Sequence, residues 1–179
     1  KILIEYMRNG INNEKEIEDR FYKSLEFGTG GLRGTLGMGT NRMNVYTVCQ
    51  ATQGVAEYVN VNCGATSGIV IAYDTRHFSE VFALETAKVL ASNGIKAYLF
   101  KKPVPTPELS FAVRELKAFG GIVITASHNP AQYNGYKVYD NTGCQITVDA
   151  ANEIYSYIKS VDIFEGVKST NVENIMYIG

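Results

Sequence analysis

Cysteine is scarce in this sequence and widely spaced. The three cysteines are Cys49, Cys63 and Cys144, and no two of them form a C-x-x-C pair. Zinc sites and disulfide frameworks depend on closely spaced or evenly numbered cysteines. The spacing therefore indicates neither, and we expect free thiols in a reducing cytoplasm.

A large charge excess and long apolar runs are missing as well. The formal net charge is −1 and no basic block occurs, which argues against a nucleic-acid-binding surface. Apolar runs such as residues 69–73 are far too short to cross a membrane. The first residues, KILIEYMR, have no apolar core or cleavage site of a signal peptide. The chain begins with Lys rather than Met, so we expect a piece of a longer protein.

The residues that are present describe one globular α/β domain. The chain has 179 residues and is 45% hydrophobic and 20% charged, which suffices for a single core. Apolar periodicity of 3.6 residues predicts helices, and short β-branched runs predict buried strands. The predicted helices are 14–25, 44–60, 80–92, 107–117 and 149–161, and the predicted strands are 69–73, 95–100, 121–125 and 136–140.

The order of these elements predicts a three-layer α/β/α sandwich with a mixed sheet. Strand, helix, strand, helix, strand gives three parallel strands with right-handed crossovers. The loop before 136–140 is too short for a crossover, so this strand is expected to be antiparallel and at an edge. Ser79 and Asp149 are expected to cap the helices that follow them. We divide the chain into an N-terminal helix and Gly-rich loop (1–40), the α/β/α domain (41–165) and a C-terminal segment leading to a second domain (166–179).

The stretch TASHNP, residues 125–130, follows the third strand directly. Ligands in open α/β sheets bind outside the carboxyl ends of the strands, which is where Ser127 falls. A polar turn and a nucleophile both explain the stretch. A hydrolase elbow is excluded because G-x-S-x-G is absent. His128 is a poor general base for Ser127 because adjacent side chains seldom point at one another. A serine that exchanges a phosphoryl group needs no triad, only positioning and positive charge.

The glycine-rich segment 28–39 surrounds a single arginine, Arg33. No G-K-[ST] follows, so it is not a P-loop, and Arg33 occupies the third glycine position of G-x-G-x-x-G. A plain linker is one explanation. A flexible backbone that presents N–H groups and a guanidinium to phosphate is the other, and the glycine content favours it.

Four further polar residues have simple structural explanations. Lys137 is typical of an exposed lysine on an edge strand, which discourages aggregation. Asp74 and Arg76 are best explained as a local ion pair in a loop, and His77 as a surface or capping residue.

Taken in order, the segments FGTGGLRG, YDTR, PVPTP and TASHNPAQYNGYK resemble the first domain of the α-D-phosphohexomutases. That superfamily includes phosphoglucomutases and phosphomannomutases. The resemblance runs from about residue 26 to 145, and its loop details are most similar to the branch of phosphoglucomutases and phosphopentomutases.

The resemblance implies a role for each matching residue. Ser127 matches the phosphoserine, whose phosphoryl group also helps to hold Mg²⁺. Lys137 matches a proposed general acid/base, and Arg33 and His128 match residues that position phosphate and substrate. Thr29, Gly30 and Asn129 are expected to line the same phosphate-binding site. In this scheme phosphoserine gives its phosphoryl group to a sugar monophosphate and takes back the other one from the bound sugar bisphosphate.

The sequence departs from the family in its length. Family members have four domains, and their D-x-D-x-D metal loop lies in the second. The aspartates here are not clustered; they are Asp19, Asp74, Asp140, Asp149 and Asp162. We therefore expect a cytoplasmic phosphoglucomutase-type first domain, whose partners are the three remaining domains and a sugar phosphate, with no nucleic acid or membrane. A phosphomannomutase or phosphopentomutase domain and a non-catalytic phosphosugar-binding module are the alternatives, and a metal-binding regulatory domain has no ligand spacing to support it. The isolated fragment is expected to be inactive.

Overall fold

The computed structural model describes residues 14–62, 68–169 and 172–179. Its helices are α2 (Glu14–Phe21), α3 (Val45–Asn62), α4 (Ser79–Ser92), α5 (Thr106–Glu115) and α6 (Val148–Ser160). Its strands are β1 (Gly31–Thr35), β2 (Ile69–Tyr73), β3 (Ala97–Phe100), β4 (Gly120–Ile124), β5 (Tyr133–Tyr139) and β6 (Ile175–Ile178). No helix in these ranges is long and apolar enough to cross a membrane.

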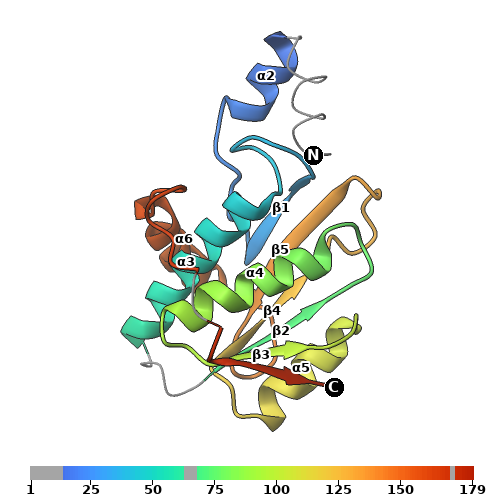
Figure 1. The fold of residues 1–179 in the computed structure, drawn as a ribbon, viewed down its shortest axis with the longest axis vertical. Coiled ribbons are helices and arrows are strands. Elements are labelled where there is room, and N and C mark those ends of the chain that lie inside the picture. The colour runs from blue at the N-terminus through green and yellow to red at the C-terminus, as the bar shows by residue number, and fades with distance from the viewer. Residues whose placement is uncertain (1–13, 63–67, 170–171) are drawn as a thin grey trace.

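The six strands form one mixed sheet in the order β1-β5-β4-β2-β3-β6. The three predicted parallel strands are confirmed as β4, β2 and β3, and the antiparallel fourth strand is confirmed as β5. Helices α3, α4 and α6 cover one face of the sheet and α5 covers the other, which gives the predicted three layers (Figure 1).

The sheet is wider than the sequence predicted on both sides. β1 pairs antiparallel with β5, so β5 lies one strand inside the edge. β6 pairs parallel with β3 at the other side. Both strands were missed because β1 is glycine-rich, which weakens strand propensity, and because β6 is only 4 residues long. They bring parts of segments 1–40 and 166–179 into the same sheet as segment 41–165.

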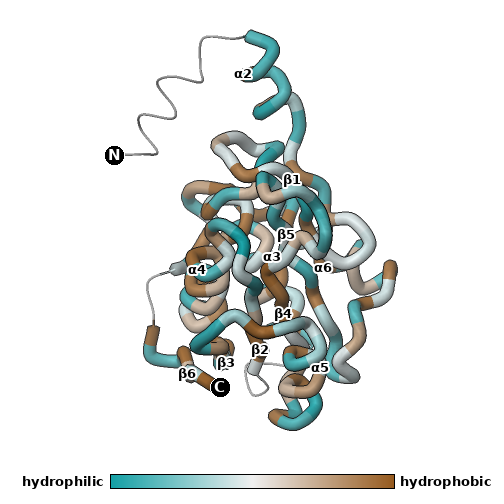
Figure 2. The backbone as a smooth tube through the Cα atoms, turned by 90° about the vertical axis from the view of Figure 1, so that its right-hand side faces the viewer, coloured by the Kyte–Doolittle hydropathy of each residue, from teal (hydrophilic) through white to brown (hydrophobic). Residues whose placement is uncertain are grey.

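Strand residues alternate between two apolar clusters. In β2, Ile69 and Ile71 face α3 and α4, while Val70 and Ala72 face α5. This burial on both faces explains why central strands of the sheet are continuous apolar runs. Figure 2 shows these central strands in the hydrophobic colour and α2, which buries no residue, in the hydrophilic one.

Two predicted helix caps are wrong. Ser79 is the first residue of α4, where its hydroxyl donates to Asp74 Oδ1 and does not cap the helix; the residue before it, Phe78, has a φ of 65°. The capping residue of α6 is Thr147, two residues before Asp149, because the Thr147 side chain accepts the hydrogen bond from Ala150 N. α4 ends before Gly94, whose φ of 79° is the left-handed conformation that stops a helix.

Candidate active site

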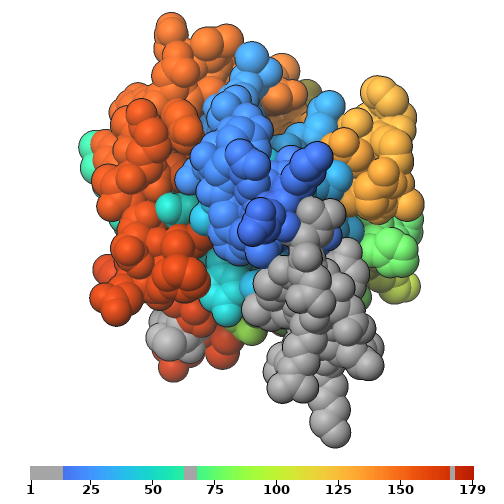
Figure 3. Space-filling model, turned by 90° about the horizontal axis from the view of Figure 1, so that it is seen from above, coloured from blue at the N-terminus to red at the C-terminus, as the bar shows by residue number. Residues whose placement is uncertain are grey.

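Ser127 lies in a loop at the carboxyl end of β4, as the sequence predicted. We call residues 125–133, which join β4 to β5, the serine loop. The Ser127 side chain is exposed, and the surface of this loop lies beside that of the β2–α4 turn (Figure 3). The hydroxyl is therefore accessible to a ligand that approaches the carboxyl edge of the sheet.

The backbone at Ser127 is unusual for a residue with a side chain. Its φ is 57°, in the left-handed region that only glycine enters without steric cost. A non-glycine residue pays about 1–2 kcal/mol for this conformation. Ser127 N donates to Thr125 Oγ1 at 3.0 Å, and Asn129 N donates to Ala126 O at 3.1 Å. These bonds hold the tight turn on both sides of the serine.

His128 contacts the serine directly, contrary to the sequence-based expectation. The distance from Ser127 Oγ to His128 Nδ1 is 3.3 Å. The expectation assumed that neighbouring side chains diverge, as in a strand. In this turn the left-handed conformation of Ser127 brings the two side chains to the same side. The imidazole can thus exchange a hydrogen bond with the serine hydroxyl.

Arg76 contributes more to this loop than its predicted ion pair. The pair exists, with 3.4 Å between Arg76 Nε and Asp74 Oδ2. The guanidinium also donates four hydrogen bonds to backbone carbonyls of the serine loop. Nη2 donates to Ser127 O and Asn129 O, each at 2.7 Å, and Nη1 donates to Pro130 O at 3.0 Å and Tyr133 O at 3.2 Å. Sequence reasoning missed this role, although Y-D-T-R at the end of a strand adjacent to β4 was a usable signal.

The aspartate that holds Arg76 is itself held by its surroundings. Asp74 Oδ1 accepts from Ser79 Oγ at 2.7 Å and from Arg76 N at 2.9 Å, and Asp74 N donates to Ile124 O at 3.1 Å. The buried Asn134 donates to Ser79 Oγ and to His77 O, each at 3.0 Å. His77 thus takes part through its backbone, while its side chain is exposed as predicted. This network ties the β2–α4 turn to β5.

Arg33 and Lys137 lie on one face of the sheet. Lys137 in β5 is opposite Val123 in β4, and Arg33 in β1 is opposite Gly135 in β5. Residues opposite each other in a ladder share a face, and Val123 belongs to the cluster packed against α5. Both cations therefore project from the α5 face, on the side of the sheet that β1 and β5 form.

The two cations are diagonal neighbours without ordinary partners. Diagonal neighbours in a sheet are about 7–8 Å apart at the backbone, within reach of long side chains. Arg33 is exposed and Lys137 half-buried, and neither makes an ion pair or a side-chain hydrogen bond with any described residue. Two cations that share a face without a counter-charge favour an anionic ligand.

The glycine-rich segment is a strand where the sequence predicted a flexible loop. Residues 31–35 pair with β5, so most of their backbone is committed to the sheet. Gly30 has a φ of 124° and its carbonyl accepts from Val138 N at 2.9 Å, while the carbonyl of the exposed Thr29 accepts from Gln145 Nε2 at 3.1 Å. The glycines permit close pairing with β5. Arg33 is the side chain of this strand that can reach an anion.

Tyr136, next to Lys137 in sequence, is no candidate for proton transfer. It is fully buried on the opposite face of the sheet, and this burial raises the pKa of its phenol far above the ordinary value. It remains a neutral core residue. Of the two neighbours, only Lys137 faces the side of the sheet that carries Arg33.

The described residues do not form a metal site by themselves. No group of three or more His, Cys, Asp or Glu side chains in this part of the chain could hold an ion. This donor set does not fit a Mg²⁺ site, which takes several oxygen ligands in octahedral geometry.

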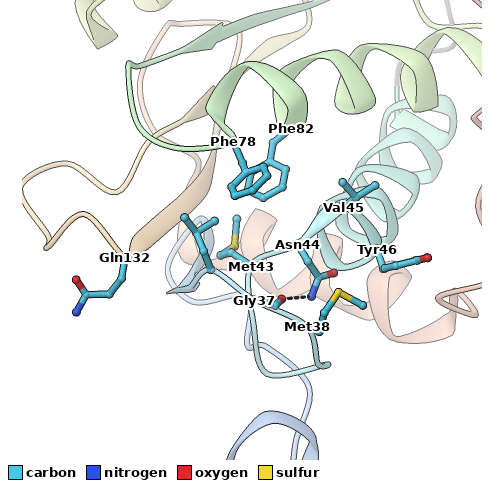
Figure 4. A pocket seen from close by; sticks show the side chains of 10 residues that line it. Gly37, Met38, Met43, Asn44, Val45, Tyr46, Phe78, Phe82 and Gln132 are labelled. Atoms are coloured by element: carbon cyan, nitrogen blue, oxygen red, sulfur yellow. Dashed lines mark hydrogen bonds between the residues drawn. The ribbon is translucent and has the colours of Figure 1, made fainter. Parts of the chain in front are cut away.

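An apolar pocket of about 360 Å³ lies between α4, the start of α3 and the segment after β1. Its lining includes Leu36, Met43, Phe78, Phe82 and Gln132 (Figure 4). Neither Ser127 nor the two cations line it, and its surface is largely carbon. It is not a phosphate-binding site.

Fold and site together define an α/β/α domain that presents an exposed serine at the carboxyl edge of its sheet. Residues 24–163 match the family described as phosphoglucomutase/phosphomannomutase, alpha/beta/alpha domain I. The chain belongs to this family.

Curated relatives and solved structures agree with this assignment. A phosphoglucomutase from Staphylococcus saprophyticus is 46% identical over 149 residues, which are 83% of this chain and 27% of that protein. A phosphoglucomutase from Staphylococcus aureus is 46% identical over 157 residues, which are 87% of this chain and 28% of that protein. The chain thus spans just over a quarter of the length of these relatives. The crystal structure of a putative phosphomannomutase from Thermus thermophilus superposes with a TM-score of 0.72 and 37% identity, covering 83% of this chain and 33% of that one.

Proposed function

We propose that this chain is the phosphoserine-bearing domain of a phosphoglucomutase-type enzyme of the cytoplasm. In this proposal the enzyme interconverts glucose 1-phosphate and glucose 6-phosphate through a bound bisphosphate. The observation that supports it is the arrangement of Ser127: an exposed hydroxyl on a fixed loop, near a sheet face on which Arg33 and Lys137 have no side-chain partner among the described residues.

The proposed reaction consists of two phosphoryl transfers. In the first, the free hydroxyl of the sugar monophosphate attacks the phosphorus of phospho-Ser127. A sugar O–P bond forms, the Ser127 Oγ–P bond breaks, the sugar hydroxyl proton goes to a base of the enzyme, and Ser127 Oγ takes up a proton. In the second, Ser127 Oγ gives up this proton and attacks the other phosphate of the bisphosphate. The sugar oxygen that leaves takes up the proton held by the base, and phosphoserine is restored. No net phosphate is gained or lost.

Lys137 is proposed as the general acid/base of these transfers. It is the half-buried cation on β5, and β5 begins where the serine loop ends. Proton transfer by a positioned side chain contributes about 10²–10⁴-fold to a rate. Arg33, one strand further, is proposed to hold phosphate oxygens through its guanidinium.

The serine loop and the segment before β1 are proposed to complete the phosphate site. His128, at 3.3 Å from Ser127 Oγ, orients the serine or its phosphoryl group. Asn129 belongs to the same turn, and its Oδ1 is buried without a partner among the described residues. Thr29 and Gly30 lie directly before the strand that carries Arg33.

Mg²⁺ is proposed to neutralise the transferring phosphoryl group in the complete enzyme. This chain would supply the phosphoryl oxygens of Ser127. Since the described residues hold no cluster of acidic side chains, the other ligands are proposed to come from a further domain. The sugar would likewise be held by three further domains, because the phosphoglucomutases that this chain matches are much longer.

Mannose or pentose phosphate is the second candidate, because the family description includes phosphomannomutases and a neighbouring structure carries that name. A non-catalytic phosphosugar-binding module would keep the fold without turnover. The presence of Ser127, Arg33 and Lys137 together argues against such a module, because a module without chemistry has no need for all three.

A coupled assay on the complete protein tests this proposal. Glucose 1-phosphate is supplied with Mg²⁺ and a trace of glucose 1,6-bisphosphate, and glucose 6-phosphate is followed through its dehydrogenase. Mannose 1-phosphate and ribose 1-phosphate are run in parallel, and formation of mannose 6-phosphate and ribose 5-phosphate is followed by ³¹P NMR. The proposal expects the highest kcat/KM with glucose phosphate. Preference for another sugar would correct the substrate, and binding without turnover of any sugar would establish the non-catalytic module.

A further inference from the structure

Arg76 stands out among the charged residues because its guanidinium is fully committed to the backbone of one loop. It makes four hydrogen bonds to carbonyls of the serine loop and one ion pair with Asp74. A guanidinium has five N–H donors in a planar fork and no acceptor. The carbonyls of Ser127, Asn129, Pro130 and Tyr133 thus occupy its four Nη–H donors, and Nε faces the Asp74 carboxylate at 3.4 Å.

We propose that Arg76 is a positioning residue, which holds the peptide of the nucleophilic serine in its left-handed conformation and thereby aims the Ser127 hydroxyl. The proposal rests on the proposed function, because it takes Ser127 as the group that exchanges phosphoryl. It assigns to Arg76 no contact with substrate, since its donors are already occupied by protein oxygens.

The backbone conformation of Ser127 explains why the serine loop needs a side chain that holds it, and we call the contacts of Arg76 with this loop the clamp. The positive φ of 57° is a conformation that a serine leaves readily when nothing opposes it. Arg76 Nη2 opposes it by binding Ser127 O and Asn129 O at 2.7 Å each, so that the carbonyls of this turn point to one donor. Rotation of Ser127 towards negative φ would move its carbonyl away from the guanidinium. The same rotation would redirect Oγ.

The clamp is in turn anchored on the rigid part of the sheet. Arg76 leaves the turn after β2, and Asp74 N is bonded to Ile124 O at the last residue of β4. Asp74 Oδ1 is fixed by Ser79 Oγ, which itself accepts from the buried Asn134 of β5. The serine loop is thus positioned against β2, β4 and β5 together. Reacting groups displaced by about 1 Å lose on the order of 10²-fold in rate.

Charge alone cannot replace this arrangement. Lysine keeps the positive charge but offers three donors from one nitrogen, whereas the loop carbonyls are spread along a turn of several residues. Arg76→Lys is therefore expected to lower kcat almost as much as Arg76→Ala does. A residue that acted only through its charge would tolerate the change to lysine.

The test compares Arg76→Ala, Arg76→Lys and a matched control, Arg114→Ala, in the complete protein. Arg114 is an exposed arginine of α5 with one weak bond to the Ser110 carbonyl. We expect kcat to fall by about 100-fold in both Arg76 variants with KM nearly unchanged. Arg114→Ala is expected to match the unsubstituted protein. Added millimolar guanidinium chloride is expected to raise the turnover of Arg76→Ala and to leave that of Arg114→Ala and Arg76→Lys unaltered.

A second measurement separates this inference from the proposed function. Hydrogen exchange is followed at the amides of Ser127 and Asn129, and both are expected to exchange faster in Arg76→Ala while amides of β2 are unchanged. If the unsubstituted protein has no mutase turnover, the proposed function fails. Unchanged amide exchange in Arg76→Ala would independently show that Arg76 does not hold the serine loop. If the unsubstituted protein is active and Arg76→Ala keeps its kcat and changes at most its KM, the inference about Arg76 is wrong and the proposed function stands. Should Arg76→Ala fail to fold, the kcat and exchange of Arg76→Lys decide the matter in the same way.

Discussion

Arg33 in β1 lies directly opposite Gly135 in β5, a position without a side chain. The guanidinium side chain therefore meets no cross-strand neighbour at its own level. A Cβ on Gly135 would lie 2.6 Å from Thr125 O and 3.0 Å from Leu32 O, so the strands on both sides approach too closely for a larger residue.

Gly135→Ala is expected to destabilise the domain by about 1–3 kcal/mol, the usual cost of forcing extra volume into a packed site. Thermal unfolding measures the change. Gly28→Ala is the matched control, because its Cβ would meet nothing closer than Gly31 O at 3.9 Å. Equal melting temperatures for the two variants would contradict the packing at Gly135.

Lys137→Ala is expected to lower kcat by about 10²–10⁴-fold, because the proposed general acid/base is removed. Arg33→Ala is expected to raise KM and lower kcat, because the charge proposed to bind phosphate in the ground state and in the transition state is removed. Steady-state kinetics on the complete protein measures both. Lys96→Ala serves as the control: Lys96 is an exposed lysine just before β3, at the amino end of the strand. A wild-type rate for Lys137→Ala would remove Lys137 from the mechanism.

Cys49 and Cys144 are expected to react with iodoacetamide at very different rates. Cys49 is a buried residue of α3, and this burial raises the pKa of its thiol to about 12, while Cys144 is exposed. The thiolate is the reactive form, so at pH 8 almost none of Cys49 is available. Peptide mapping of the alkylated, folded protein is expected to show label at Cys144 and hardly any at Cys49. In urea both should be labelled. Rapid modification of Cys49 in the folded protein would contradict its position in the core.

The sequence predicted the central part of the fold because its signals are strong there. The run at 69–73 is apolar throughout since β2 is buried on both faces. It predicted β1 as a loop because glycines, which in the structure permit close pairing with β5, carry no strand propensity. It missed β6 because a strand of 4 residues with two exposed positions has no clear alternation.

The sequence predicted the site residues that belong to a local motif, but it did not predict the contacts that depend on the tertiary fold. The position of Ser127 at the carboxyl end of β4 followed from strand order alone. The four bonds from Arg76 to the serine loop join residues more than 50 positions apart, and no local pattern reports them. The contact of His128 with Ser127 depends on one left-handed residue, which sequence does not reveal for serine.

Residues 1–179 alone are expected to show no mutase turnover with sugar phosphate, bisphosphate and Mg²⁺. The described residues offer no acidic cluster for the metal, and electrostatic stabilisation and positioning dominate phosphoryl transfer. The coupled assay with this chain and with the complete protein, at equal concentration, measures the difference. Circular dichroism confirms that the chain is folded. Turnover by the chain alone would mean that it contains a metal site that the described residues do not show.

The location of the phosphoryl group decides whether Ser127 is the residue that exchanges it. The complete protein is incubated with ³²P-labelled glucose 1,6-bisphosphate, digested, and mapped by mass spectrometry, alongside a Ser127→Ala variant. We expect label on the peptide that contains Ser127, at the serine itself, and we expect Ser127→Ala to be folded, unlabelled and without turnover. Label on another residue, or mutase turnover by a folded Ser127→Ala protein, would contradict this expectation.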